Sequence, residues 1–362
     1  MHSPANILDV PRSVTTLLAA ELASRRADVS NIDPRLGELV DHLITFTLQG
    51  GKRLRPQFLI WGWRAVRPDS EELQPALLRA AASLELIQTC ALMHDDIIDR
   101  SETRRGEPST HRAVTKGHAG QGLSGDGDHF GTSLALLLGD LALAWADDMF
   151  TEAALALGRA KEAMPVWRAM RTEVLAGQML DVATAAANHS DPALQAADAM
   201  AVNRYKTAAY TVERPLHLGA TLAGGSEAVI AALRSYGEDI GIAFQLRDDQ
   251  LGVFGEPSIT GKPAGDDLVE GKRTLLLARA RADLEGMPEL AELDAGIGAV
   301  ADAQRVGRLT SIIAGTTAVQ QIESCIAELH TSGVAALADP SVDRAAATAL
   351  TLLAAAATTR TF

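Results

Sequence analysis

The sequence predicts an all-α fold, a single large bundle of helices, and three features predict it. Apolar residues recur at i, i+3 and i+4 through the segments 77–93, 130–150 and 229–249, which is the spacing of a helix with one buried face. Hydrophobic residues make up 47% of the chain but aromatic residues only 4%, so aliphatic side chains must fill the core, and the Ala-rich segments favour helix. We find no convincing strand alternation and no Asn-Gly hairpin signal between β-branched runs.

Proline and glycine place the ends of the expected elements. A first helix is expected over 13–26, after Pro4 and Pro11. Pro56 lies at the start of another helix, where its missing N–H costs little. The Gly-rich stretch 117–131 is interpreted as a flexible surface loop. Further loops are expected at 67–70, 101–110, 188–192 and 255–266.

One domain is expected over residues 1–362. It would comprise an N-terminal helix within 1–30, a core over 31–285 that carries the motifs described below, and C-terminal helices over 286–362. The tail is assigned to the same bundle because it is Ala-rich and helix-periodic, without obvious chemistry of its own.

The charge of the chain disfavours nonspecific nucleic-acid binding. The net charge is −13, and nonspecific nucleic-acid binding needs a basic surface. An anionic substrate would have to be captured by local basic groups and metal ions, because the global field repels it.

Cysteine usage and hydropathy predict a cytoplasmic protein. Cys90 and Cys325 both lie in apolar helical segments, so we expect buried thiols and no disulfide framework. The N-terminus lacks the features of a signal peptide. Asp140 interrupts the best candidate for a membrane span, so stable membrane insertion is not expected.

The segment HDDIIDRSETRRGEP (94–108) is the most informative stretch of the sequence. On a helix, Asp95 and Asp99 are i, i+4 neighbours on one face, with Asp96 about 100° around the axis. Such close carboxylates repel each other unless a cation lies between them, and clusters of this kind suit Mg²⁺. Arg104 and Arg105 follow at once, which suggests that a phosphorylated substrate supplies the remaining ligands.

Two further clusters strengthen this interpretation. Asp248 and Asp249 lie in FQLRDDQLGVFG (244–255), again after an apolar helical run, and the basic motif GGKRLRP occupies 50–56. A lone acidic motif would equally well be a solvated helix end. Two acidic motifs and a basic motif together predict a pocket for two diphosphates and several Mg²⁺ ions.

From about Gly50 to Leu277 the chain resembles the trans-isoprenyl diphosphate synthases, or polyprenyl synthetases. The motifs that carry the resemblance are GGKRLRP, ELIQ, DDIIDRSETRRG, GQMLD (177–181), YKTA (205–208), FQLRDD and TGKPAGDDLVEGKRT (260–274). Segments 126–148 and 248–274 are most similar to actinobacterial short-chain members, including geranylgeranyl diphosphate synthases. The resemblance implies a helical bundle of the isoprenoid synthase type with a central apolar cavity. It also implies a homodimer and about three Mg²⁺ ions per site, for which Mn²⁺ is an alternative.

The resemblance also implies roles for individual residues. It assigns the catalytic roles to Asp95, Asp99, Arg104, Lys206, Asp248 and Lys262. The metal ligands would be Asp95, Asp96, Asp99, Asp248 and Asp249. The diphosphate of isopentenyl diphosphate would contact Lys52, Arg55, Gln88 and Arg105. The allylic diphosphate would contact Arg104, Lys206, Gln245, Lys262 and Lys272, with Thr207, Gln178 and Asp181 lining the cavity.

Three positions carry further expectations. The family pattern often has a third acidic residue where this chain has Gly252, and Asp267 is the candidate for a compensating carboxylate. Arg53 is interpreted as a solvated neighbour of Lys52. His94 is expected to pack or to hydrogen-bond near the motif rather than to bind metal.

The implied reaction is prenyl transfer. Isopentenyl diphosphate would condense head-to-tail with dimethylallyl, geranyl or farnesyl diphosphate. A class I terpene cyclase also uses an Asp-rich motif and Mg²⁺, but it has no use for a second diphosphate site built from Lys52, Arg55 and Arg105. A non-catalytic synthase subunit should have lost the acidic motifs, and this chain keeps both.

Product length is expected to depend on the helix that leads into Asp95. The growing chain would pass the stripe formed by Ala91, Cys90, Ile87 and Leu84. Related synthases that stop at farnesyl diphosphate have an aromatic residue at position 90 or 91, and both residues are small here. We therefore expect geranylgeranyl diphosphate, with farnesyl or longer polyprenyl diphosphates as the alternatives.

Overall fold

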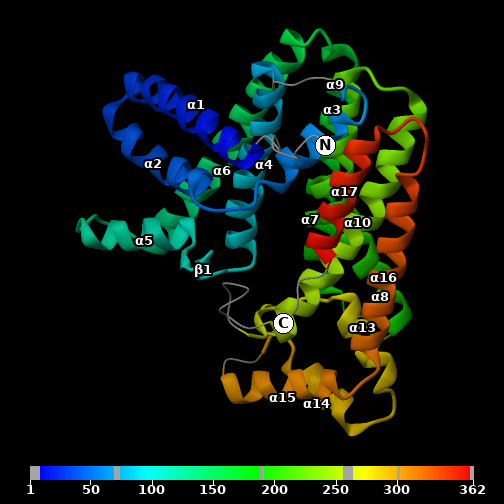
Figure 1. The fold of residues 1–362 in the computed structure, drawn as a ribbon. Coiled ribbons are helices and arrows are strands. Elements are labelled where there is room, and N and C mark those ends of the chain that lie inside the picture. The colour runs from blue at the N-terminus through cyan, green and yellow to red at the C-terminus, as the bar shows by residue number, and fades with distance from the viewer. Residues whose placement is uncertain are drawn as a thin grey trace. The chain divides into compact units, whose positions relative to one another are not determined.

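The structure is a computed structural model that describes residues 9–68, 74–187, 189, 191–255, 264–299 and 302–358. These residues are almost entirely helical (Figure 1), which confirms the all-α prediction. The chain divides into two compact units. Unit 1 comprises Met1–Ile60 and Asp69–Met164, and unit 2 comprises Trp61–Pro68 and Pro165–Phe362. The expected single domain stays a prediction.

Unit 1 is built around the helix that carries the first acidic motif. This helix, α4, packs against α6, α1, α2 and α5. The elements of unit 1 are α1 (Val10–Ile32), α2 (Pro34–Leu48), α4 (Pro75–Ile98), β1 (Thr103–Arg104), β2 (Glu107–Pro108), α5 (Thr110–Gly120) and α6 (Gly127–Ala156). Two helices, α3 (Leu54–Arg64) and α7 (Ala160–Ala186), begin in unit 1 and end in unit 2.

The first helix is longer than the predicted 13–26. Asp9 caps its N-terminus, because its carboxylate accepts a hydrogen bond from the N–H of Arg12 at 3.1 Å, and Pro11 lies in the first turn. These are ordinary start signals. Asp33 ends α1 and in turn caps α2, accepting from the N–H of Arg35 at 2.9 Å.

The prediction of a flexible loop over 117–131 is wrong for most of that stretch. Helix α5 extends to Gly120, and α6 begins at Gly127. Asp126 caps α6 through the backbone N–H groups of the next turn. A Cβ at Gly131 would lie 2.4 Å from the carbonyl oxygen of His111, so this glycine serves the close packing of α5 on α6.

Unit 2 is built around α10 (Glu227–Phe254), which packs against η1, α16, α9, α17, α12 and α13. The element η1 (Asn203–Glu213) has π-helical hydrogen bonding. The other helices are α8 (Pro192–Val202), α9 (Arg214–Ala223), α12 (Asp266–Glu270), α13 (Leu275–Asp283), α14 (Pro288–Gly296), α15 (Ala303–Ala314), α16 (Ala318–Ala336) and α17 (Arg344–Thr358).

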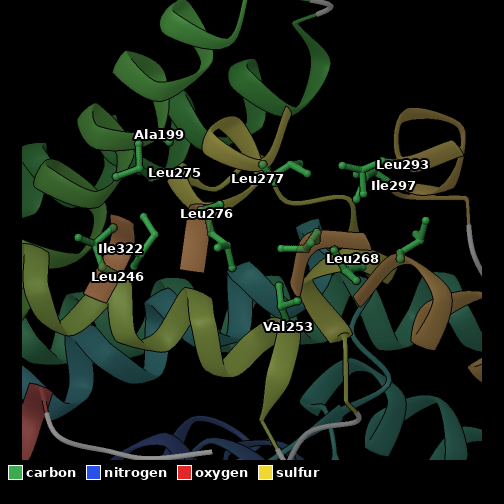
Figure 2. Close-up of a cluster of buried hydrophobic side chains, with 14 of the residues drawn as sticks. Ala199, Leu246, Val253, Leu268, Leu275, Leu276, Leu277, Leu293, Ile297 and Ile322 are labelled. Carbon is green, nitrogen blue, oxygen red and sulfur yellow. The ribbon is translucent and has the colours of Figure 1, made fainter. Parts of the chain in front are cut away.

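A cluster of buried apolar side chains holds the second acidic motif in place. Leu246 and Val253 of α10 flank the motif in sequence and pack in the same cluster as Leu268 of α12 and Leu276 of α13 (Figure 2). Fully burying such a side chain contributes about 1.5–3 kcal/mol. The cluster therefore fixes α12 and α13 against the end of α10 that carries Asp248.

Two helices, α4 and α6, are long and apolar enough to cross a membrane by length and composition. The most apolar window of α4 is 67% buried inside the protein, as expected for a core helix. The corresponding window of α6 is 39% buried. Length and composition alone do not identify a membrane span. The cytoplasmic location stays a prediction.

Candidate active site

The two acidic motifs lie in different units, and each is described by itself. The first motif occupies the last turn of α4. Asp99 caps the helix, and Arg100 adopts a left-handed conformation with φ 55°. The N–H of Ser101 then donates to the carbonyl of Asp96 at 2.9 Å, as in a common helix-ending motif. The chain therefore reverses directly after its acidic residues.

The reversal leads into a short hairpin, with two residues in each strand, that the sequence did not predict. Strands β1 and β2 pair Arg104 with Glu107. The turn residues Arg105 and Gly106 have φ values of 57° and 80°, and positive φ at both central residues is the geometry of a type I′ turn. The sequence signal was weak because arginine rarely occupies the first of these positions.

The hairpin places Arg104 against the acidic motif. Its Nε donates to Asp96 Oδ1 at 2.8 Å, its Nη2 contacts the same oxygen, and Asp95 Oδ2 lies 3.5 Å from Nη2. Asp96 is fully buried, whereas Asp95 and Asp99 are half-buried. In this geometry Asp96 positions Arg104, and the metal role expected of all three carboxylates stays a prediction.

The basic motif forms a tight turn that Arg105 closes. Gly50 and Gly51 have positive φ, and a Cβ at either would lie about 3.4–3.5 Å from the Arg105 side chain. Arg105 donates to the carbonyl of Gln49 and lies over the ring of Phe46 at 5.5 Å. Burial lowers the pKa of Arg105, and the nearby arginines add to this effect. Two motifs far apart in the sequence thus form one basic cluster in unit 1.

The expectation of a solvated Arg53 is wrong. Its side chain is buried, with Nη1 2.5 Å from Glu85 Oε2 on α4. Its Nη2 donates to the carbonyls of Thr47 and Leu48, the last turn of α2. Sequence reasoning missed Glu85, although a glutamate within the apolar run of α4 signals a buried partner.

The residues expected to set product length fall on different sides of α4. Ala91 and Gln88 are half-buried, on the face that carries Asp95. Cys90 is buried, and its Sγ lies 3.8 Å from Nδ1 of His94. Burial raises the pKa of the Cys90 thiol to about 12, with a smaller contribution from Asp140 on α6.

His94 packs toward α6, and the expectation that it does not bind metal stays a prediction. Its Nε2 lies 3.1 Å from the carbonyl of Leu136. A Cβ at Gly139 would lie 2.2 Å from that nitrogen, so the glycine makes room for the ring. Cys90 therefore lies at the contact between α4 and α6, whereas Ala91 lies on the face of α4 that carries Asp95. Leu84 and Ile87 are buried deeper in unit 1.

The second motif lies on one face of α10. Gln245 and Asp248 are half-buried there, and a spacing of three residues puts them on the same face of the helix. Asp249 is buried, and its Oδ1 accepts from Gln245 Nε2 at 2.6 Å. Its Oδ2 has no hydrogen-bond partner within the described part of the chain. Burial raises the pKa of Asp249 to about 7, and the charges of Asp267 and Asp248 contribute to the rise.

The π-helical element places one expected residue against the second motif and another against α7. Thr207 donates to Gln245 Oε1 at 2.7 Å, and Lys206 Nζ lies 2.5 Å from Asp181 Oδ2 on α7. Gly177 permits the close approach of α7 to η1, since a Cβ at this position would lie 2.3 Å from the backbone nitrogen of Lys206. Each expected residue here has a defined place, although π-helix was not foreseen.

Lys272, another basic residue expected at the site in unit 2, is paired with carboxylates. Lys272 Nζ lies 3.2 Å from Asp267 Oδ1 and 2.7 Å from Glu270 Oε2. Lys262 lies outside the described residues. Lys262 is therefore the one expected site residue of unit 2 that the described ranges do not include.

The donor set fits Mg²⁺. Every candidate ligand is a carboxylate oxygen, which this ion prefers, and Mg²⁺ usually takes one or two carboxylates together with water and phosphate oxygens. The buried Oδ2 of Asp249, which has no hydrogen-bond partner among the described residues, could accept a cation. In the described ranges, no three His, Cys, Asp or Glu side chains gather closely enough to hold a metal ion by themselves. Substrate oxygens and water would therefore complete the coordination.

Comparisons with known proteins agree over most of the chain. The polyprenyl synthetase family model matches residues 34–333. A crystal structure of geranylgeranyl pyrophosphate synthase from Corynebacterium glutamicum, complexed with isoprenyl diphosphate and magnesium, is 44% identical with a TM-score of 0.94. The match covers 98% of this chain and 100% of that chain.

Two curated relatives match over smaller shares of both chains. The geranylfarnesyl diphosphate synthase of Aeropyrum pernix is 34% identical over 301 residues, which are 82% of this chain and 85% of that protein. The geranylgeranyl diphosphate synthase of Mycobacterium tuberculosis is 32% identical over 268 residues, which are 72% and 68% of the two chains.

Proposed function

Because the chain belongs to the polyprenyl synthetase family and is a trans-prenyltransferase, we propose that it condenses isopentenyl diphosphate with dimethylallyl, geranyl and farnesyl diphosphates. Geranylgeranyl diphosphate is the proposed main product. The observation that carries the proposal is the cluster in unit 1, where Arg104 contacts the acidic motif and Arg105 closes the basic turn. A metal-binding motif beside a separate anion-binding turn suits an enzyme that handles two diphosphates.

The basic turn binds the diphosphate of isopentenyl diphosphate. Lys52 and Arg55 flank the buried Arg53, and Arg105 joins them from the hairpin. Gln88, on the Asp95 face of α4, adds an amide donor. Arginine suits bidentate contacts with phosphate, whereas lysine supplies a compact charge. Basic side chains alone can hold this diphosphate, since it does not leave.

The allylic diphosphate leaves, so its charge must be stabilised as it develops. Arg104, Lys206, Gln245 and Lys272 are the proposed contacts, with Lys262 as a further one outside the described residues. When bound at Asp95 and Asp99, and at Asp248, Mg²⁺ supplies positive charge to the leaving diphosphate; three ions are proposed, and Mn²⁺ is an alternative. Asp96 holds Arg104 toward the motif.

Pyrophosphate release tests the function. Isopentenyl diphosphate with farnesyl diphosphate should release pyrophosphate only when Mg²⁺ is present, and EDTA should stop the reaction. A terpene cyclase would instead release pyrophosphate from an allylic diphosphate alone. Chromatography of the dephosphorylated products would identify the chain length. Failure to incorporate isopentenyl diphosphate would refute the proposal.

Replacing Ala91 with phenylalanine should shorten the main product by one isoprene unit. The residue lies on the Asp95 face of α4 and is half-buried, so an aromatic ring there would block the path of the growing chain. Product chromatography checks this, with Ala91→Ser as the matched small substitution that should leave the product unchanged. An unaltered spectrum in Ala91→Phe would contradict the proposed path.

We also propose a homodimer. Helix α6 leaves much of its apolar surface uncovered, since Leu136, Leu137 and Leu155 are 46%, 61% and 64% exposed. Apolar patches of this kind commonly mark protein interfaces. Light scattering should give twice the chain mass for the wild type and the mass of one chain for Leu136→Glu/Leu137→Glu. A wild-type protein with the mass of a single chain would exclude the dimer.

A further inference from the structure

An ion pair joins the two ends of the π-helical element η1. Arg204 Nη1 donates to Glu213 Oε2 at 2.6 Å, across a separation of nine residues. In an α-helix of about 3.6 residues per turn, this separation is about two and a half turns, so the two side chains would point to opposite sides. A π-helix bonds residue i to i+5 and has about 4.4 residues per turn, so the same separation is about two turns and both side chains share a face. The ion pair therefore fits the π-helical register and not the α-helical one.

Glu213 is the buried centre of this arrangement. Its side chain is 1% exposed, and its other oxygen, Oε1, accepts from Nε of Arg234 on α10 at 2.8 Å. Burial alone would raise the pKa of Glu213, but the hydrogen bonds from Arg204 and Arg234 hold the pKa below its usual value, so the carboxylate is charged. Buried ion pairs often add little to stability, and their best-attested use is to specify one conformation.

Glycines let the backbone of η1 lie directly against both neighbouring helices. On α10, a Cβ at Gly237 or at Gly241 would lie 2.5 Å from a backbone Cα of η1. On α7, a Cβ at Gly177 would lie 2.3 Å from the backbone nitrogen of Lys206. These obstacles are backbone atoms, which a change of rotamer cannot move aside. The place of η1 between α7 and α10 is therefore fixed by backbone contact.

Two of the expected site residues lie within the segment that the ion pair spans. The face of α10 that carries the glycines continues to Gln245, which accepts from the Thr207 hydroxyl at 2.7 Å. Lys206 Nζ lies 2.5 Å from Asp181 Oδ2 of α7. Returning this segment to an α-helix would change the rotation per residue, so the side chains of Lys206 and Thr207 would point in other directions.

We propose that the ion pair between Arg204 and Glu213 locks η1 in its π-helical register and so aims Lys206 at the allylic diphosphate and Thr207 at Gln245. The inference rests on the proposed function, which gives Lys206 its contact with that diphosphate. Arg204 and Glu213 are positioning residues, because they act on the reaction through other side chains. Positioning of this kind matters because a misplacement of about 1 Å can cost about 10²-fold in rate.

Arg204→Met breaks the ion pair within η1. It should lower kcat about 10–100-fold and leave the KM for isopentenyl diphosphate unchanged, whereas Arg204→Lys keeps the charge and should retain most of kcat. The matched control is Arg234→Met, which removes the other cation that contacts Glu213 but leaves the ion pair within η1 in place. A second control, Glu238→Gln, removes the other carboxylate that pairs with Arg204. Both controls should keep the wild-type kcat.

A double-mutant cycle tests whether Arg204 acts through Lys206. In the Lys206→Ala background, Arg204→Met should lower kcat no more than about 3-fold, because the side chain that it positions is already gone. Independent effects would multiply instead. A general loss of stability would lower kcat equally in both backgrounds, so the cycle separates positioning from a merely structural role.

Hydrogen exchange of the backbone amides tests the lock without substrate or turnover. Exchange within η1 (Asn203–Glu213) should be faster in Arg204→Met than in Arg234→Met, because only the first variant loses the ion pair that joins the two ends of the element. The comparison is made on the full chain for both variants, since each removes one arginine from the same buried carboxylate.

Three results would overturn the inference. They are a wild-type kcat in Arg204→Met, an undiminished effect of Arg204→Met in the Lys206→Ala background, and equal exchange of η1 in Arg204→Met and Arg234→Met. None of them affects the proposed function, which is judged on the wild type alone by incorporation of isopentenyl diphosphate. An inactive wild type in which Arg204→Met still loosens η1 and Arg234→Met does not would refute the function and leave the register lock standing.

Discussion

Asp95→Asn and Asp99→Asn should each lower kcat by about 10³-fold or more, which corresponds to about 4 kcal/mol of lost transition-state stabilisation. Both carboxylates lie in the last turn of α4 and are half-buried, and Arg104 Nη2 lies 3.5 Å from Asp95. The asparagine variants remove the charge that would hold Mg²⁺ but keep the shape of the side chain. Steady-state release of pyrophosphate at saturating Mg²⁺ measures the effect.

The fold should survive these substitutions. Neighbouring carboxylates repel each other without a cation, so removing one charge relieves repulsion. A suitable control is Asp148→Asn, which removes a 59% exposed carboxylate of unit 1 that pairs with Arg25. Exposed pairs contribute about 0–1 kcal/mol to stability, and kcat should not change. Near-wild-type turnover in Asp95→Asn or Asp99→Asn would exclude the proposed metal role.

Glu85→Leu should lower the free energy of unfolding by about 3–5 kcal/mol. The side chains of Arg53 and Glu85 are 3% and 6% exposed, with 2.5 Å between Nη1 and Oε2. Removing the carboxylate leaves the guanidinium charge buried and uncompensated, which is the costly way to break a buried ion pair. Urea denaturation followed by circular dichroism measures the loss.

Two further variants test whether the broken ion pair causes the stability loss in Glu85→Leu. The double variant Arg53→Met/Glu85→Leu removes both charges and should recover most of the lost stability, because apolar replacement of a whole buried pair is often neutral. Glu292→Gln breaks the pair between Glu292 and Arg308, whose side chains are 44% and 54% exposed. Exposed pairs contribute little to stability, so this variant should lose far less stability than Glu85→Leu. A double variant as unstable as Glu85→Leu would show that the ion pair is not the cause.

Local features of the sequence were enough to predict the class of fold and to locate the two acidic motifs and the basic motif. Helical periodicity and Ala-rich composition depend only on nearby positions, and the all-α expectation is confirmed. The motifs around Asp95 and Asp248 could be found because their chemistry shows in residue type and spacing. Gly252 could be noticed as a departure from the family pattern, but sequence alone left its consequence open.

Other features depend on contacts between residues far apart in the chain, so only the tertiary structure decided them. Arg53 looks like a solvated neighbour of Lys52 until Glu85 is brought within 2.5 Å of it. Cys90 and Ala91 are adjacent in sequence, yet the packing of α4 on α6 separates their environments. Asp267 reaches the space above Gly252 because buried leucines hold α12 against α10. Residue types and spacing predict which groups can do chemistry, whereas packing decides which of them lie together.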